Sequence, residues 1–410
     1  MRPAWLLCCA IGLAPVASAD PLTFSEAMAR AGSDGPSITA RKAAADSARL
    51  SIGPAGQLPD PQIAFGLDNY PVSGPAQFTL NRDDMTMLSV GIMQDMPSGA
   101  ERSARTGLAT AEAEMAGAAL EISRLEARRA AASAWIEIYF GMARVSVLDR
   151  QVDELETLAS ASIAALASGS PAADSALAAR MDAARVADRL AETRAAITGA
   201  QAELERWIGP VGGDRPGPEA PMFEIEADGL RARLDQHVKL LASATEIERA
   251  RAGLGLARAE TQPDWSWELA YQRRDPTFGD MVTLGVRFSL PLFQGTRQKP
   301  VIEARRADVS RAAAEREAIV REHRTILETR LAERAAAVER LDRARTLLLP
   351  ISRQRAAAVA AAHGAGAAPL SDAIMARNAE TEIELEIIDL EQRLTSVSAM
   401  LSLEYGEVAP

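Results

Sequence analysis

Residues 264–292 read DWSWELAYQRRDPTFGDMVTLGVRFSLPL, and this stretch decides the fold. Trp265, Trp267, Leu269 and Tyr271 alternate with small or polar residues, and the same alternation returns between residues 282 and 290. A period of two places successive side chains on opposite faces of a β-strand. Residues 264–292 therefore predict a strand pair with one apolar, aromatic face and one face that carries acidic, amide and basic side chains.

A second strand pair is predicted over residues 61–97. Apolar residues alternate with small or polar ones from Ile63 to Leu67 and again from Leu88 to Ile92. Strands of about ten residues with this alternation are typical of transmembrane β-structure. No apolar run of about 18 residues, the minimum for a membrane helix, follows the first 20 residues. Any part of the mature chain within a membrane is therefore expected to be β-structure.

Long helices are predicted for most of the remaining chain. Aromatic residues make up only 4% of the chain and charged residues 25%, a composition typical of long helices with thin, alanine-rich seams. Residues 99–208 and 296–405 each predict a helical hairpin, with sharp breaks at 168–171 and 364–366. In the first hairpin, Ala118, Ile122 and Leu125 begin a track of alternating four- and three-residue steps, which indicates a coiled-coil seam.

The order of these elements occurs twice. Pro59-Asp60 precedes the first strand pair and Pro263-Asp264 the second, while Asp84-Met85 and Asp280-Met281 begin the return strands. Landmarks that recur in the same order indicate an internal duplication. We expect a first structural repeat over 20–221 and a second over 222–410, each with a helix, a strand pair and a long helical hairpin. The helices before the strand pairs are expected over 22–56 and about 227–259. The helices of the second hairpin are expected over about 300–363, with Pro350 as the only interior breaker, and over 370–405.

The N-terminal residues 1–19 have the features of a signal peptide. Arg2 precedes an apolar stretch, and Ala17-Ser18-Ala19 forms a small-residue cleavage site. Cys8 and Cys9 lie within this segment, so the mature chain is expected to lack thiols, disulfides and an acylated N-terminal cysteine. We therefore expect an exported protein that is not lipid-anchored. The net charge of −11, with both signs mixed along the helices, argues against a nucleic-acid partner.

The strand count predicts an oligomer. Four strands cannot close a barrel, and an open sheet edge in lipid leaves unpaired backbone groups that cost several kcal/mol each. Three protomers would supply twelve strands, enough to enclose a water-filled lumen. The expected fold class is mainly α with a small transmembrane β part: long antiparallel coiled-coil hairpins plus four β-strands per protomer, assembled as a homotrimer with a twelve-stranded barrel and an α-helical tunnel.

These features resemble the TolC-like outer-membrane efflux proteins over residues 20–410. The matching segments are 58–62, the return strand from Asp84, residues 280–292, and the two hairpin tips that follow Gly169 and Gly366. The resemblance implies a homotrimeric channel in the outer membrane of a Gram-negative bacterium, in contact with outer-membrane lipid, with a periplasmic helical tunnel. It further implies a passive exit duct for metal ions or small toxic compounds. Its implied partners are a periplasmic adaptor (membrane fusion) protein and an inner-membrane RND-type pump, and the strands most resemble the heavy-metal efflux branch.

The hairpin tips contain the candidate site residues. By resemblance, the tips form the periplasmic entrance, and Gly169, Ser170, Gly364 and Gly366 contact the adaptor. Asp372 matches an acidic gate that selects for cations. In the first tip the corresponding residue is Ser175, and the adjacent Asp174 is the gate candidate; alternatively, each aspartate caps a helix, as Asp commonly does.

Two arginines near the tips also have two interpretations. Arg180 and Arg377 are candidates for a latch that pairs with acidic neighbours and closes the tunnel. The alternative is that both are solvated residues on a helix face.

No cofactor, metal site or enzymatic activity is predicted. Met87 and Met93 share one face of a strand and carry soft thioether ligands, although methionine is also an ordinary apolar filler. The three histidines are far apart in sequence and lack metal-ligand spacing, so we expect them at the surface. Phosphate loops, nucleophile elbows and zinc-binding spacings do not occur.

The alternative interpretation of the whole chain is a secreted or periplasmic coiled-coil interaction or adaptor protein with no channel activity. An adaptor has one helical hairpin flanked by soluble β-modules, whereas this sequence predicts two hairpins and only four strands.

Overall fold

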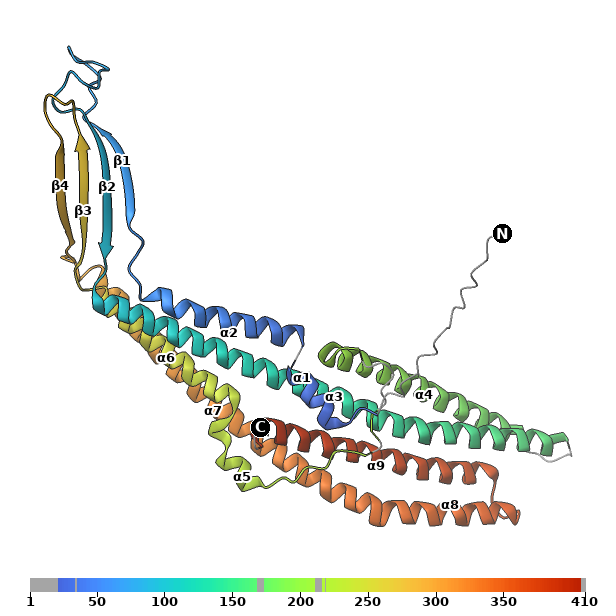
Figure 1. Ribbon diagram of the computed structural model, residues 1–410. Coiled ribbons are helices and arrows are strands. Elements are labelled where there is room, and N and C mark those ends of the chain that lie inside the picture. Colours follow the sequence, from blue (N-terminus) through green and yellow to red (C-terminus); the bar gives the residue numbers. More distant parts are fainter. Residues whose placement is uncertain (1–20, 34, 168–172, 211–215, 218, 407–410) are drawn as a thin grey trace, which may run out of the picture. The chain divides into compact units, whose positions relative to one another are not determined.

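The computed structural model describes residues 21–33, 35–167, 173–210, 216–217 and 219–406 (Figure 1). The predicted signal peptide (residues 1–19) and the tip residues 168–171 lie outside this part of the chain. The elements in chain order are α1 Phe24–Ser33, α2 Pro36–Ala55, β1 Gln62–Asp68, β2 Met87–Met96, α3 Gly99–Ala167, α4 Ala173–Ile208, α5 Ala227–Ala232, η1 Leu234–Gln236, α6 Val238–Ala259, β3 Asp264–Arg273, β4 Met281–Ser289, α7 Gln298–Arg343, η2 Ala344–Leu348, α8 Leu349–Gly364 and α9 Leu370–Tyr405.

The four strands form one antiparallel sheet in the order β1-β2-β3-β4. The register gathers apolar side chains on one face, where two rows of paired residues cross all four strands: Ile63, Ile92, Leu269, Leu284 and Phe65, Val90, Tyr271, Val282. The opposite face carries rows of small or mostly polar residues: Ala64, Gly91, Ala270, Thr283 and Gly66, Ser89, Gln272, Met281. The predicted alternation is thus present in the sheet, and pairing extends it across all strands.

The chain divides into two compact units, and each contains segments from both halves of the sequence. The first unit consists of residues 1–35, 127–224 and 332–400, and the second consists of residues 36–126, 225–331 and 401–410. The predicted order of helix, strand pair and hairpin occurs twice along the chain. The duplication itself stays a prediction.

The first unit has a core of small and branched side chains between hairpin helices. One cluster joins Leu148 and Leu155 of α3 to Ala179 and Val186 of α4 and to Leu385 of α9. Small residues such as alanine allow α4 to lie close to the second part of α3, and α9 close to α8 (Figure 1). The predicted track in α3 faces inward, since Leu125, Ala132 and Ile136 are all buried.

The start of the described chain is packed against α3 in the same unit. Trp135 is fully buried, and its Nε1–H donates a hydrogen bond of 3.0 Å to the carbonyl oxygen of Leu22. The ring of Phe24 packs edge-on against Trp135, with 5.6 Å between the ring centroids. These contacts hold the segment before α1 on the surface of α3.

Three of the predicted helices are interrupted. The helix expected over 22–56 is divided into α1 and α2, because Pro36 starts a new helix at its first position. The helix expected over 227–259 is also divided, with extended backbone at His237 (φ −59°, ψ 133°). The helix expected over 300–363 contains the π-helical turn η2 directly before Pro350. Proline lacks an N–H and its ring crowds the carbonyl four residues earlier, which a wider turn relieves.

Among the described residues, every helix is too short or too polar to cross a membrane.

Candidate functional site

The tip between α8 and α9 is a sharp turn at Gly366. The φ angle of Gly366 is +77°, in the left-handed region that favours glycine. The N–H of Gly366 donates to the carbonyl of His363 (2.9 Å), and the N–H of Ala367 donates to that of Ala362 (2.8 Å). This pair of hydrogen bonds is a Schellman motif with Gly366 immediately after the C-cap. Gly364, in contrast, is the last residue of α8 and lies outside the region of positive φ.

Asp372 lies in the first turn of α9, as its third residue, and its side chain is exposed. Its backbone N–H donates a hydrogen bond of 3.2 Å to the carbonyl of Pro369. The carboxylate is therefore near the positive end of the helix dipole, which stabilises a negative charge. It lines an open groove beside the tip together with Arg355 and Met375. This position leaves the charge of Asp372 accessible to solvent and ions.

The corresponding residues of the first tip are only partly described. Gly169 and Ser170 lie outside the described residues. Asp174 is the second residue of α4, and only its backbone position is described. Arg180, one turn and a half further along α4, has an exposed side chain.

Arg377 makes a two-pronged ion pair between two helices. Its Nε and Nη2 atoms each lie 2.8 Å from a carboxylate oxygen of Glu154 in α3. Its Nη1 atom lies 2.7 Å from Glu380, one turn along α9. The hydrogen bonds from Arg377 lower the pKa of the Glu154 carboxyl, and those to Glu154 raise the pKa of the guanidinium. Of the two interpretations of Arg377, the structure shows the residue paired with acidic neighbours.

The ion pairs continue beyond Arg377 into a network that joins α3, α8 and α9. Arg353 of α8 lies 3.4 Å from Glu380 and 3.0 Å from Glu384. Glu384 also pairs with Arg150 of α3. The three arginines, Glu154 and Glu380 line a groove of about 660 Å³, together with alanines of α8 and α9. Planar guanidinium groups suit such multiple pairing because each presents several donors in a fixed geometry.

Met87 and Met93 lie on the same face of β2 but do not form a common site. They are six residues apart on one strand, which corresponds to about 20 Å at 3.3 Å per residue. One ion cannot bind both sulfur atoms of the same chain at that distance.

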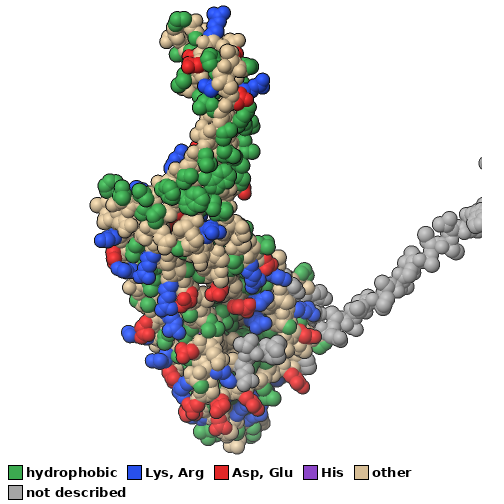
Figure 2. Space-filling view, turned by 60° about the vertical axis from the view of Figure 1, so that its left-hand side comes forward, with side chains coloured by type: hydrophobic (Ala, Val, Ile, Leu, Met, Phe, Trp, Pro, Cys, Tyr) green, Lys and Arg blue, Asp and Glu red, His purple; other side chains and the backbone are tan. Residues whose placement is uncertain are grey.

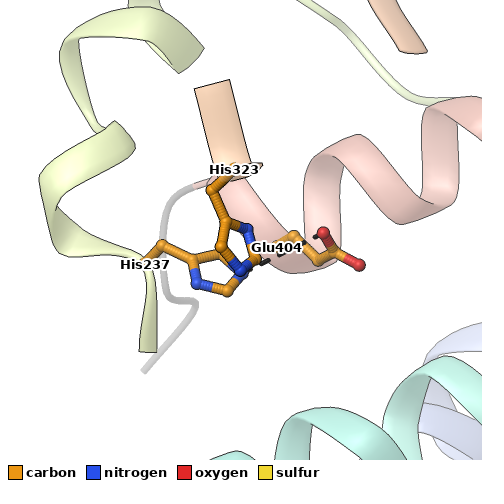
Figure 3. Close-up of side chains that lie close together, drawn as sticks. All are labelled: His237, His323 and Glu404. Atoms are coloured by element: carbon orange, nitrogen blue, oxygen red, sulfur yellow. Dashed lines mark ion pairs between the residues drawn. The ribbon is translucent and has the colours of Figure 1, made fainter. Parts of the chain in front are cut away.

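The surface expectation for the histidines is wrong for two of the three. His237 and His323 are buried, with 2% and 4% of their surfaces exposed, and their rings lie against each other beside Glu404 (Figure 3). His363 is exposed at the tip, where its Nδ1 lies 3.0 Å from the carbonyl oxygen of Ala368. Spacing in the sequence did not reveal the pair, because the tertiary fold brings the two histidines together.

The apolar face of the sheet is open along its length. Phe65 is 82% exposed and Leu284 71% exposed, and Figure 2 shows hydrophobic side chains gathered over the strands. An apolar surface that crosses four strands is larger than a monomeric soluble protein ordinarily leaves in water. This face requires a partner or a membrane.

No protein-family model matches the chain. The chain is similar to the cobalt-zinc-cadmium resistance protein CzcC of Cupriavidus metallidurans, with 24% identity over 302 residues that cover 72% of this chain and 69% of the relative. Among solved structures it is similar to CusC (TM-score 0.79, 12% identity, 93% of this chain and 92% of that one). It is also similar to the outer-membrane protein VceC of Vibrio cholerae (TM-score 0.74, 19% identity, 93% and 96%). At these identities the structures show a shared fold, and the predicted resemblance to TolC-like outer-membrane efflux proteins is confirmed at that level.

Proposed function

We propose that this chain is the outer-membrane channel component of a tripartite efflux system, a passive exit duct across the periplasm and outer membrane of a Gram-negative bacterium. One observation carries the proposal: a four-stranded sheet with an exposed apolar face is followed directly by very long helices. The apolar rows suit contact with lipid, and the rows of small and polar residues suit contact with water. The shared fold with outer-membrane channels supports the same function.

The active assembly is a homotrimer. Strands β1 and β4 are the edges of the sheet in one chain. Unpaired edge groups in lipid cost several kcal/mol each, so each edge strand would pair with the opposite edge of another chain. Three copies give twelve strands and a lumen wide enough for water. The hairpins of the same three copies would form the periplasmic tunnel.

The exported substrates are divalent heavy-metal ions. The relative CzcC is a cobalt-zinc-cadmium resistance protein, and the similarity to it covers 72% of this chain. A periplasmic adaptor protein would contact the hairpin tips, including Gly169, Ser170, Gly364 and Gly366, and an RND-type pump would supply the ions. A strain that lacks this chain is expected to become sensitive to these metals and to recover when the gene is returned.

Asp372 is the gate residue of this channel; in the first tip the corresponding residue is Ser175, and the adjacent Asp174 is the gate candidate there. Three exposed carboxylates around one axis attract cations and repel one another. Arg377 and Arg180 would hold the tip helices closed, and the pairing of Arg377 with Glu154 supports this role for the second hairpin.

The proposal is tested by locating the full-length chain and measuring its conductance. We expect it in the outer-membrane fraction as a trimer, with ion-conducting events after insertion into a planar lipid bilayer. A soluble, monomeric and non-conducting product would contradict the channel function and favour the adaptor interpretation.

The gate is tested in the same bilayer experiment with Asp372→Ala. In the trimer, this substitution removes three negative charges near the axis. These charges together attract a passing cation by about 1 kcal/mol, so their loss should lower the cation-to-anion permeability ratio about 5-fold. Glu339→Ala, which removes an exposed carboxylate of α7 outside the tip, is the matched control and should leave the ratio unchanged. Equal selectivity of the two variants would exclude Asp372 as the gate.

A further inference from the structure

Three buried side chains that can bind metal ions meet in the second unit. His237 precedes α6, His323 belongs to α7 and Glu404 lies near the end of α9 (Figure 3). Their exposed fractions are 2%, 4% and 7%. Two of the three histidines of the chain are thus placed beside one carboxylate, away from water. Buried groups of this kind ordinarily pair with one another or bind a metal ion.

The distances between the potential ligand atoms are short. One ligand atom from each residue can be chosen so that all three lie within 4.8 Å of one another. Nε2 of His237 lies 3.9 Å from Oε2 of Glu404, and the centroids of the two imidazole rings are 3.9 Å apart. Ligands of a tetrahedral zinc ion are about 3.3 Å apart at metal–ligand distances near 2 Å. Small side-chain rotations would therefore bring the three atoms to bonding distance.

The groups around the cluster hold two of the three ligands in suitable orientations. Nδ1 of His323 lies 3.0 Å from the hydroxyl oxygen of Tyr405, and that hydroxyl lies 3.4 Å from the backbone oxygen of His323. If the hydroxyl donates to the backbone oxygen, it accepts from Nδ1–H and leaves the lone pair on Nε2. Arg330 lies 2.6 Å from Oε2 of Glu404 and so fixes the carboxylate. Metal-binding histidines and carboxylates commonly have such second contacts.

We propose that His237, His323 and Glu404 bind one divalent transition-metal ion of the zinc class as a resident structural ion. Two imidazoles and one carboxylate form a ligand set that zinc accepts, with a fourth position for water. The ion would join the segment before α6, helix α7 and the end of α9. It is separate from any exported ion, and the proposal does not depend on which compound the channel carries.

Binding has one local cost, at His237. In the structure, Nδ1 of His237 accepts a hydrogen bond of 3.2 Å from the backbone N–H of Lys239 at the start of α6. Coordination through Nε2 moves the proton to Nδ1, and the amide of Lys239 then loses this acceptor. One neutral hydrogen bond is a small loss compared with three metal–ligand bonds.

The test is direct metal binding by the purified full-length protein, prepared without a histidine tag and treated with a chelator. Titration with Zn²⁺ against a chromophoric chelator should show one tightly bound ion per chain. His323→Gln and Glu404→Gln should each weaken binding at least about 100-fold, and Tyr405→Phe, which removes only a hydroxyl, about 10-fold. His363→Gln changes the exposed histidine at the tip and is the matched control, with binding equal to that of the original protein.

Cobalt provides a second measurement that needs no ligand variant. Co²⁺ bound to the unaltered protein should give the visible absorption bands of a four-coordinate ion, and excess Zn²⁺ should abolish them. Absence of a stoichiometric ion and of these bands in the unaltered protein would overturn the proposal. So would equal binding by folded His323→Gln and His363→Gln variants, compared after circular dichroism and gel filtration.

Discussion

Replacement of Arg377 by alanine tests whether the ion-pair network holds the second hairpin tip. Arg377 joins α9 to α3 through Glu154 and also contacts Glu380, whose side chain is only 7% exposed. In Arg377→Ala, Glu380 keeps only the more distant contact with Arg353, at 3.4 Å. We therefore expect the tip to open locally more often, while the rest of the protein remains folded.

The free-energy cost of Arg377→Ala can be estimated from the exposed fractions of the side chains that Arg377 contacts. The pair between Arg377 and Glu154 is 43% and 33% exposed, so solvent screening limits its contribution to about 1 kcal/mol or less. Glu380 is nearly buried, and loss of its closer partner costs about 1–2 kcal/mol. A total of about 2 kcal/mol corresponds to a roughly 30-fold increase in the opening equilibrium.

The opening equilibrium of the tip can be measured by hydrogen exchange with mass spectrometry on the purified protein, from peptides of α9 near the tip. The matched control is Arg189→Ala, which breaks an interhelical pair with Glu382 in which both side chains are about half exposed. This control should accelerate exchange less than 3-fold, because exposed pairs contribute little. A double-mutant cycle of Arg377→Ala with Glu154→Gln should give a coupling of about 1 kcal/mol.

The ion pair between Arg377 and Glu154 should make the stability of the tip depend on pH. The pKa of Glu154 is lowered in the folded protein, so its contribution to stability is present above the ordinary glutamate pKa and disappears as the pH falls through the lowered value. The difference in exchange between the original protein and Arg377→Ala should therefore be full at pH 7 and shrink below about pH 4. If Arg377→Ala exchanges within 2-fold of the original protein at pH 7, or no faster than Arg189→Ala, the network does not hold the tip.

Two further predictions concern the turn and the sheet. Gly366→Ala forces a side chain into a left-handed backbone conformation (φ +77°), which costs about 1 kcal/mol and should increase exchange at the tip about 5-fold, whereas Gly364→Ala, with no positive φ, should not. Phe65→Arg places a charge on the exposed apolar face of the sheet, which costs about 2–4 kcal/mol near the middle of a bilayer and should greatly reduce the trimer recovered from outer membranes. Thr283→Arg on the opposite face should assemble normally; equal assembly of both variants would show that the apolar face does not meet lipid.

The local periodicity of the sequence predicted the elements that depend on neighbouring residues. The alternation around Phe65 and Trp265 defined the strands, and the final helix was predicted and observed over Leu370–Tyr405. Periodicity did not predict the break at His237, whereas Pro350 marked the interruption in the second hairpin. At His237, the interruption depends on a side chain that accepts the hydrogen bond from Lys239, and the pattern of apolar residues contains no sign of it.

The partners of single side chains were beyond the sequence, because they are distant in the chain. The sequence favoured a solvated helix face for Arg377, and only the fold placed this residue beside Glu154, 223 positions away. His323 and Tyr405 are 82 positions apart and in contact. The scarcity of histidine, with three in 410 residues, was the one available signal that two of them could have a common role.

The predicted duplication bears on the number of metal ions that each chain should bind. Landmarks of the two halves are offset by 196 to 204 positions, as in Asp84 and Asp280 or Pro59 and Pro263. Ser33 lies 204 positions before His237 and Ala127 lies 196 positions before His323, and all three histidines of the chain lie in the second half, so the first half offers no imidazole ligand. A duplicated fold would therefore hold a cluster in one half only, and one ion per chain is the stoichiometry expected. A second ion of equal affinity would have to bind at another site. If His323→Gln abolished binding of that second ion as well, the assignment of one ion to the cluster of His237, His323 and Glu404 would be wrong.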